Sequence, residues 1–266
     1  MDTGNECQYD THAMTVFASL RADPAFAQLH RSLDIYYGNP ERDAAMDRLN
    51  ARFLPPGALA FDIGSHVGDR IASFRRLGAR VVALEPQPLC ARAIRALYGT
   101  DPKVTVVEAA CGDRVGSLTL RINSANPTVS TASARFIDAA DGAGGWEGQV
   151  WDAEAEVACT TLEALITAHG LPAFVKIDVE GFEEAVLAGL SRPLPALSFE
   201  FTTIQRDIAL RCLERLAALG AYGFDIALGE SHALTFGRWI SQTEMAAHIA
   251  ELPHVANSGD VYCRVR

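Results

Sequence analysis

The chain has 266 residues, of which 49% are hydrophobic and 21% charged, the balance of a globular protein with one large domain or one domain and a small extension. Its net charge of −10 excludes a broad nucleic-acid-binding surface, because phosphate contacts require clustered Lys and Arg. No basic-then-apolar signal segment opens the sequence, and no apolar run approaches the roughly 20 residues of a membrane span. We therefore expect a soluble, cytoplasmic protein.

The N-terminal part predicts a partly helical extension. Residues 1–22 carry little periodic signal, and helical patterns follow at Pro24–Tyr37 and Glu41–Phe53. Acidic residues begin the second pattern, as the helix dipole favours. Pro55-Pro56-Gly57 then breaks the chain, so we assign residues 1–55 to this extension.

The main domain, residues 56–266, alternates short apolar runs with helical patterns. This alternation predicts βαβ units and a doubly wound, mostly parallel α/β sheet. The strands are expected at Ala58–Asp62, Arg80–Leu84, Lys103–Val107, Phe174–Asp178 and Ala196–Phe201. The helices are expected at Asp69–Leu77, Pro88–Leu97, Thr161–Ala168, Phe182–Ala188 and Ile204–Leu219.

Two regions depart from this alternation. Ser117–Ile122 predicts an extra strand, and residues 123–152 then form a variable loop rich in Ser, Thr, Ala and Gly, which is typical of a lid or a disordered segment. The chain ends in β-type segments that fit a final hairpin without a full crossover. They are expected at Gly223–Leu228, Leu234–Ile240 and Asp260–Val265, with a helix at Gln242–Leu252 before the last.

Six scattered cysteines form no Cys-x-x-Cys pair, and several lie in apolar runs. Such thiols behave as small hydrophobic side chains, so we expect reduced core cysteines. They are Cys7, Cys90, Cys111, Cys159, Cys212 and Cys263.

A glycine-rich turn follows the first strand of the main domain. Asp62 ends the strand, and Gly64 and Gly68 precede a helix, so a ligand could approach main-chain N–H groups. A dinucleotide site needs Gly-x-Gly-x-x-Gly, but His66 and Asp69 occupy the second and third glycine positions. An acidic residue here suits a ligand with an amine and a sulfonium, as in S-adenosylmethionine. A purely structural strand–helix turn is the alternative.

The ends of the next two strands supply further candidate ligand contacts. Glu85, followed by Pro86, comes 23 residues after Asp62, where a carboxylate can accept hydrogen bonds from both ribose hydroxyls of a nucleoside. Cys111-Gly-Asp113 lies where residues would contact the edge of an adenine ring, although Gly-Asp is also a good turn dipeptide.

The most distinctive segment is Phe174-Val-Lys-Ile-Asp-Val-Glu-Gly181. Period-two alternation predicts that Lys176, Asp178 and Glu180 share one side of the strand, at the sheet edge where open α/β sheets bind ligands. Ionisable groups there are costly unless they are paired or used, and a structural Lys–carboxylate cluster is the alternative. Glu200 adds a carboxylate on the next strand.

These motifs, in order and spacing from about Phe61 to Phe201, resemble the FkbM-type family of class I S-adenosylmethionine-dependent methyltransferases. The matching pieces are Asp62–Gly68, Glu85-Pro86, Cys111–Asp113, Thr160–Leu165, Lys176–Gly181 and Glu200. The resemblance implies a Rossmann-like sheet of seven strands with an antiparallel last strand. It also implies O-methylation of a hydroxyl on a small metabolite, sugar or polyketide. His66, where the family often has Asn, the extension and the 123–152 loop depart from the shared pattern.

The site residues follow from the motifs and this resemblance together. The cofactor-binding set is Asp62, Gly64, Ser65, His66, Val67, Gly68, Glu85, Pro86, Cys111, Asp113 and Asp178. The catalytic set is Lys176, Asp178, Glu180 and Glu200.

Methyl transfer to an alcohol requires alignment of the reactants and loss of the hydroxyl proton. Our hypothesis is that Asp178 or Glu180 is the base, that Lys176 fixes its charge, and that Glu200 or His66 orients a ligand. We assign no metal, although Asp178, Glu180 and Glu200 offer hard oxygen ligands. An NAD- or nucleotide-binding enzyme and a non-catalytic binding protein are the competing functions. The extension could cover the site or form a homodimer contact.

Overall fold

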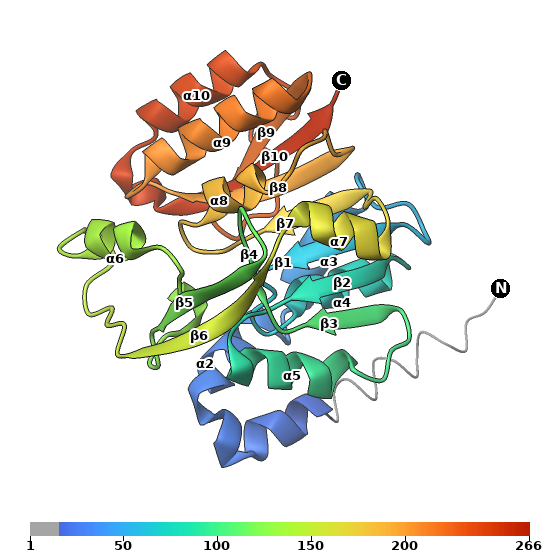
Figure 1. Cartoon of the computed structure of the whole chain (residues 1–266), viewed down its shortest axis with the longest axis vertical. Coiled ribbons are helices and arrows are strands. Elements are labelled where there is room, and N and C mark those ends of the chain that lie inside the picture. Colours follow the sequence, from blue (N-terminus) through green and yellow to red (C-terminus); the bar gives the residue numbers. More distant parts are fainter. Residues whose placement is uncertain (1–15) are drawn as a thin grey trace.

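A seven-stranded sheet runs through the centre of the computed structural model, which describes residues 16–266 (Figure 1). In spatial order the strands are β3 (Val104–Val107), β2 (Arg80–Leu84), β1 (Leu59–Ile63), β7 (Phe174–Ile177), β8 (Ala196–Thr202), β10 (Ser258–Val265) and β9 (Tyr222–Leu228). The pairs from β3 to β8 are parallel, and β10 is antiparallel to both of its neighbours. The expected Rossmann-like sheet with an antiparallel last strand is confirmed.

Helices cover both faces of this sheet, because its strands are apolar on both sides. On β1, Ala60 belongs to the core cluster of one face, whereas Phe61 and Ile63 belong to that of the other. The first face is covered by α4 (Asp69–Arg76) and α5 (Pro88–Tyr98). The second is covered by α7 (Leu162–His169), α8 (Glu183–Ala188), α9 (Arg206–Leu219) and α10 (Gln242–Glu251). None of the helices within residues 16–266 is long and apolar enough to cross a membrane.

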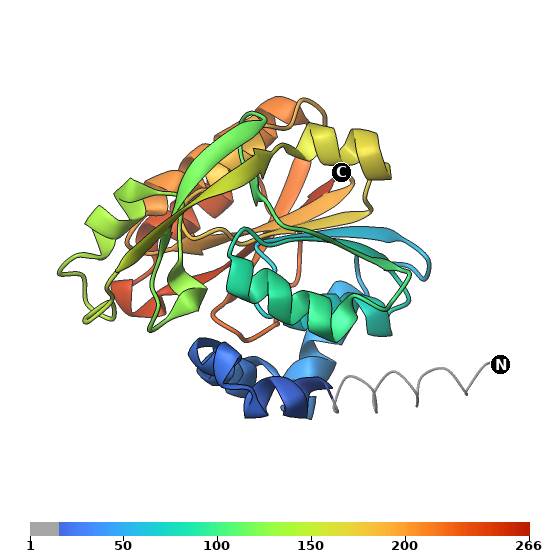
Figure 2. The same cartoon turned by 60° about the horizontal axis from the view of Figure 1, so that its bottom comes forward.

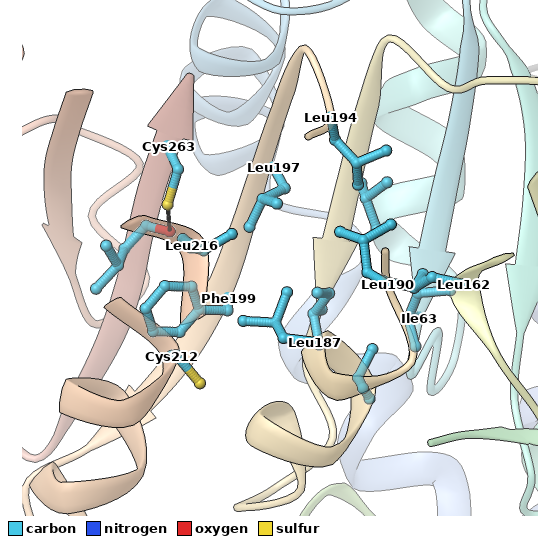
Figure 3. Packing of buried hydrophobic residues seen from close by; sticks show 14 of the residues in the cluster. Ile63, Leu162, Leu187, Leu190, Leu194, Leu197, Phe199, Cys212, Leu216 and Cys263 are labelled. Atoms are coloured by element: carbon cyan, nitrogen blue, oxygen red, sulfur yellow. Dashed lines mark hydrogen bonds between the residues drawn. The ribbon is translucent and has the colours of Figure 1, made fainter. Parts of the chain in front are cut away.

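The core of the second face is drawn in Figure 3. Leu187 and Leu190 at the end of α8 and Phe199 of β8 are fully buried together. Cys212 and Cys263 fill the same core as small apolar groups. All five described cysteines are free and buried, as the sequence predicts, and Cys7 lies outside the described residues.

The N-terminal helices pack below α5 on the first face (Figure 2). Residues 16–22 are helical, although their sequence shows little periodicity. The elements after them are η1 (Pro24–Leu29), α2 (His30–Tyr36) and α3 (Pro40–Asn50). Phe53, which follows α3, stacks on Phe174 of β7 and Tyr262 of β10 with ring centroids 4.9 and 5.6 Å apart. The extension therefore shares a core with the sheet.

A second, three-stranded sheet flanks the expected variable loop on both sides. Its order is β4 (Ala110–Cys111), β6 (Ala153–Thr160) and β5 (Gly116–Ile122). Between β5 and β6 lie η2 (Pro127–Val129) and α6 (Ala134–Ala140), so residues 123–152 are not a structureless loop. Ser133 caps α6 by accepting from the Phe136 N–H. Phe136 and Trp146 pack edge to face at 5.1 Å, which gives the segment a small core of its own.

The C-terminal part differs from expectation at one element. Residues 234–240 form no strand, and only an isolated bridge joins Ile240 to Phe224 of β9. The chain then passes through α10 and η3 (His254–Ala256) into β10. Because β10 inserts between β8 and β9, its first residues lie at the sheet edge that carries the predicted site.

Candidate active site

A cavity of about 940 Å³, including the part open to solvent, lies at the carboxyl ends of β1, β2 and β7. Ten of the predicted site residues line it: Asp62, Gly64, Ser65, His66, Glu85, Pro86, Cys111, Lys176, Asp178 and Glu180. The structure thus brings together the three motifs that the sequence separates by more than 100 residues. Val67, Gly68, Asp113 and Glu200 do not line this cavity.

Asp62, at the end of β1, is a buried carboxylate without a partner. Its side chain faces the cavity, and among residues 16–266 neither carboxylate oxygen has a hydrogen-bond donor. Burial raises the pKa of Asp62 to about 7, because the charged form loses its hydration. An unpaired buried carboxylate is costly in free energy, so Asp62 is suited to accept a hydrogen bond from a ligand or to pair with a ligand cation.

The glycine turn after β1 packs directly against the backbone of Asp178, the residue that follows β7. Gly64 has a φ of 85°, and a Cβ on it would overlap with the carbonyl oxygen of Asp178. Only glycine combines this left-handed conformation with so close an approach. The turn after β1 and the turn after β7 therefore touch directly, which places the predicted cofactor loop beside the predicted catalytic carboxylates.

Glu85, at the end of β2, is held by main-chain donors. Its Oε2 accepts from the His66 N–H at 2.7 Å and its Oε1 from the Gln87 N–H at 2.8 Å. Burial raises the pKa of Glu85 to about 8. Each carboxylate oxygen has a second lone pair, so Glu85 retains the capacity to accept hydrogen bonds from two ligand hydroxyls.

His66 lines the cavity with an uncharged imidazole. Its Nε2 lies 3.3 Å from Thr128 Oγ1, and its Nδ1 lies 3.7 Å from Cys90 Sγ. Burial lowers the pKa of His66 to about 4, so the imidazole carries no charge near neutral pH. Its φ of 47° is the left-handed conformation that turns its N–H toward Glu85.

Three predicted cofactor residues lie elsewhere. Asp113 is half-exposed, with its carboxylate 3.7 Å from Arg114, so its side chain lies away from the cavity. Val67 is fully buried in the core, and its carbonyl accepts from the Tyr37 hydroxyl at 2.8 Å. Gly68 begins α4 with a φ of 88° and does not line the cavity.

Lys176 forms a buried ion-pair network at the centre of this edge. Its Nζ lies 2.9 Å from Asp178 Oδ2 and 2.6 Å from Asp260 Oδ1. Burial opposes ionisation of Asp178, but the Lys176 charge, hydrogen bonds from Glu200 and Lys176 and the Arg70 charge together outweigh it and lower the Asp178 pKa. Asp260 escaped sequence analysis because it comes from β10, paired opposite Glu200, and no local motif marks it.

Glu180 and Glu200 converge on Asp178, but not by strand alternation. β7 ends at Ile177, and Glu180 lies in a left-handed turn with a φ of 54°. One carboxylate oxygen from each of Asp178, Glu180 and Glu200 lies within 4.8 Å of the others. Burial, and then the Asp178 charge, raises the pKa of both glutamates. These three carboxylates are called the acid cluster below.

Sequence reasoning missed the outer wall of the cavity. Tyr36, Asp69, Arg70 and Glu230 line it, and Arg42 bridges Asp69 and Glu230 at 2.7 Å each. These residues come from the extension, α4 and the loop after β9. No motif links them, because the fold alone brings them together.

One protein family and several solved structures resemble this chain. The sequence model of the Methyltransferase FkbM domain family matches residues 62–226. No curated protein matches the chain. Similar solved structures include an O-methyltransferase from Bacillus cereus in complex with SAH (13% identity, 97% of this chain and 91% of that chain, TM-score 0.46). They also include precorrin-6y C5,15-methyltransferase from Geobacter metallireducens GS-15 (15%, 86% and 89%, 0.42) and a TehB-like SAM-dependent methyltransferase from Corynebacterium glutamicum (13%, 91% and 96%, 0.43).

Proposed function

Because the chain belongs to the FkbM family of S-adenosylmethionine-dependent methyltransferases, we propose that it methylates a hydroxyl oxygen of a small metabolite, sugar or polyketide. The observation that carries this proposal is the contact between Gly64 and Asp178, which joins a cofactor turn to a cluster of carboxylates. An oxygen acceptor has to lose a proton, and the carboxylates beside the cofactor turn are suited to receive it.

The cavity fits the cofactor. S-adenosylmethionine supplies a methyl group that its sulfonium already activates. Asp62 would meet the cationic end of the molecule, since both of its oxygens lack donors among the described residues. Glu85 would accept from the ribose hydroxyls, and Cys111 and Pro86, which line the cavity, would border the adenine. The Gly64–Gly68 turn would bring main-chain groups close; we propose no contact for the half-exposed Asp113.

The residues on the acceptor side act by positioning and by proton transfer. Asp178 and Glu180 face the cavity, and one of them is the proposed proton acceptor when the oxygen–methyl bond forms. Lys176 keeps Asp178 ionised and fixed in place through the Asp260 pair. Holding the acceptor oxygen in line with the methyl group contributes most of the attainable acceleration, and a positioned base adds about 10²–10⁴ in rate.

The proposal is tested by calorimetry with adenosylhomocysteine and by transfer of labelled methyl groups to a panel of hydroxyl and amine acceptors. We expect adenosylhomocysteine to bind and alcohols to be methylated. Glu180→Gln should lower kcat by about 10²–10⁴ with cofactor affinity retained. The matched variant Glu154→Gln, on exposed β6, should retain activity. Absence of adenosylhomocysteine binding would refute the proposal, and methylation of amines alone would refute the oxygen acceptor.

A further inference from the structure

We propose that the acid cluster, Asp178, Glu180 and Glu200, binds a divalent cation that prefers hard oxygen ligands, such as Mg²⁺ or Mn²⁺. This inference rests on the proposed function only for the position of the acceptor. The three ligand oxygens lie within 4.8 Å of one another. Around Mg²⁺ at about 2.1 Å, neighbouring oxygens are about 3 Å apart and opposite ones about 4.2 Å. Small side-chain rotations would therefore close the cluster onto an ion.

The side chain of Glu180 points to a ligand independently of this spacing. The residue is 7% exposed, and within residues 16–266 the pKa of its carboxyl is influenced by burial and by the charges of Asp178, Glu183 and Lys176, with no hydrogen bond among the causes. A buried carboxylate is normally paired, or it coordinates a metal. The left-handed turn that aims Glu180 inward is fixed by Thr131, whose hydroxyl donates to the Glu180 carbonyl at 2.7 Å.

An orphaned amide oxygen lies on the other side of the cluster. Gln205 is 5% exposed, and its Oε1 is buried without a donor in the described part of the chain. It lines a small cavity together with Glu200 and Gly181, and a Cβ on Gly181 would overlap with it. Amide oxygens are hard ligands, so Gln205 offers a further acceptor beside Glu200.

The local charge balance also leaves room for a cation. Lys176 already contacts two carboxylates, Asp178 and Asp260. The nearby Arg70 pairs with Asp69 at 3.2 Å and with Glu230 at 3.6 Å. Among the described residues neither Lys176 nor Arg70 forms an ion pair with Glu180 or Glu200, although the Lys176 charge partly offsets the raised pKa of both. Like charges this close cannot all persist without a proton or an ion between them.

A cation at this position would act on the acceptor. Asp178 and Glu180 line the cavity beside the cofactor turn, so a hydroxyl in the cavity could become a further ligand of the ion. A bound cation lowers the pKa of a coordinated oxygen. Each carboxylate would use one oxygen for the ion, and the second oxygen of Asp178 or Glu180 would remain available to receive the hydroxyl proton.

The test is titration of chelator-treated protein with Mn²⁺ alone, with free Mn²⁺ measured by electron paramagnetic resonance. We expect one site per chain. Glu200→Gln should weaken Mn²⁺ binding tenfold or more yet still bind adenosylhomocysteine, because Glu200 does not line the cofactor cavity. Glu251→Gln removes the same charge from an exposed residue at the end of α10 and should leave the Mn²⁺ affinity unchanged.

Three results would overturn the cation site. One is protein that binds adenosylhomocysteine but takes up no Mn²⁺ at about 10 mM, beyond the range of weak oxygen sites. The second is an equal loss of Mn²⁺ affinity in Glu251→Gln. The third concerns Glu180→Gln, which replaces Glu200→Gln as the test variant if Glu200→Gln fails to fold. An unchanged Mn²⁺ affinity of Glu180→Gln would then overturn the cation site. Mn²⁺ binding without adenosylhomocysteine binding would support the cation site and refute the proposed function.

Discussion

Asp62 shows how a single residue reveals a ligand. A buried carboxylate without donors costs free energy in the folded protein, and we propose that a ligand supplies the compensating group. Glu85 differs because two main-chain N–H groups already hold it in place. We therefore propose different roles for the two carboxylates: Asp62 pairs with the cationic group of the cofactor, and Glu85 accepts hydrogen bonds from its hydroxyl groups.

We predict that the affinity for adenosylhomocysteine rises about tenfold between pH 5.5 and 7.5, where the ligand ammonium stays charged. The pKa of Asp62 is about 7 and that of Glu85 about 8, because both are buried, so binding to their charged forms releases protons. Calorimetry at several pH values, in buffers of different ionisation enthalpy, measures both effects. Asp62→Asn should weaken binding about tenfold, or ~1.4 kcal/mol, and flatten the profile. A wild-type affinity that falls with pH would contradict this assignment.

A matched pair of glycine variants tests the contact between the two turns. Gly64 and Gly142 both have positive φ, 85° and 72°, but only Gly64 would place a Cβ against Asp178. Both alanine variants carry the backbone cost of about 1 kcal/mol. In denaturant unfolding, Gly64→Ala should lose about 2 kcal/mol more free energy of unfolding than Gly142→Ala. Gly64→Ala should also lose adenosylhomocysteine binding. Equal losses in the two variants would show that the overlap is relieved without cost.

At the scale of elements, the sequence predicts the central strands well because they are continuous apolar runs. β1, β2, β7 and β8 lie within two residues of their expected bounds. β6 escaped prediction, since its Ala-Glu-Ala-Glu start is unfavourable for a strand, and its pairing with β5 overrides that preference. α6 escaped because seven residues give too little periodicity. Asp260 and the outer wall depend on pairing over long sequence separations, which no local pattern encodes.

The extension offers a prediction about packing. Phe53 lies between Phe174, Tyr262 and Trp239, and it is 8% exposed, whereas Ile35 of α2 is 50% exposed. Phe53→Ala should lower the free energy of unfolding by about 3–5 kcal/mol through lost contacts and a cavity. Ile35→Ala should cost about 0.5 kcal/mol or less. Thermal and urea unfolding measure both. If Phe53→Ala proved as stable as Ile35→Ala, the extension would not share the core of the sheet.

At the scale of the whole molecule, the active site draws on most of the chain. Its lining runs from Tyr36 to Glu230, and Asp260 supports it from the last strand. Two clusters of charge meet there, the buried Lys176 network and the Arg42–Glu230 network, whose Glu230 side chain is half-exposed. Overall stability is therefore linked to the protonation of this one edge.

We predict that the unliganded protein loses stability as the pH rises from about 4 to 8. The folded pKa values of Asp62 and Glu85 exceed their ordinary values, so at these two groups the folded state binds more protons than the unfolded state over this range. The lowered pKa of His66 offsets only part of this loss. The contribution of Asp62 and Glu85 to the free energy of unfolding is fully present below about pH 4. It is completely lost once the pH exceeds their folded pKa values. Each pKa unit corresponds to about 1.4 kcal/mol. Urea unfolding at pH 5 and pH 8 measures the difference, which saturating adenosylhomocysteine should reduce. Equal stability at both values would contradict the prediction.

The antiparallel insertion of β10 has a consequence for the order of assembly. β9 is made before β10, yet it joins the sheet only through β10, which separates it from β8. During synthesis the edge of β8 therefore stays open, and Lys176 lacks Asp260, until the final strand leaves the ribosome. Late insertion of this strand delays completion of the catalytic edge, because β8 and Lys176 gain these partners only when Ser258–Val265 joins the sheet.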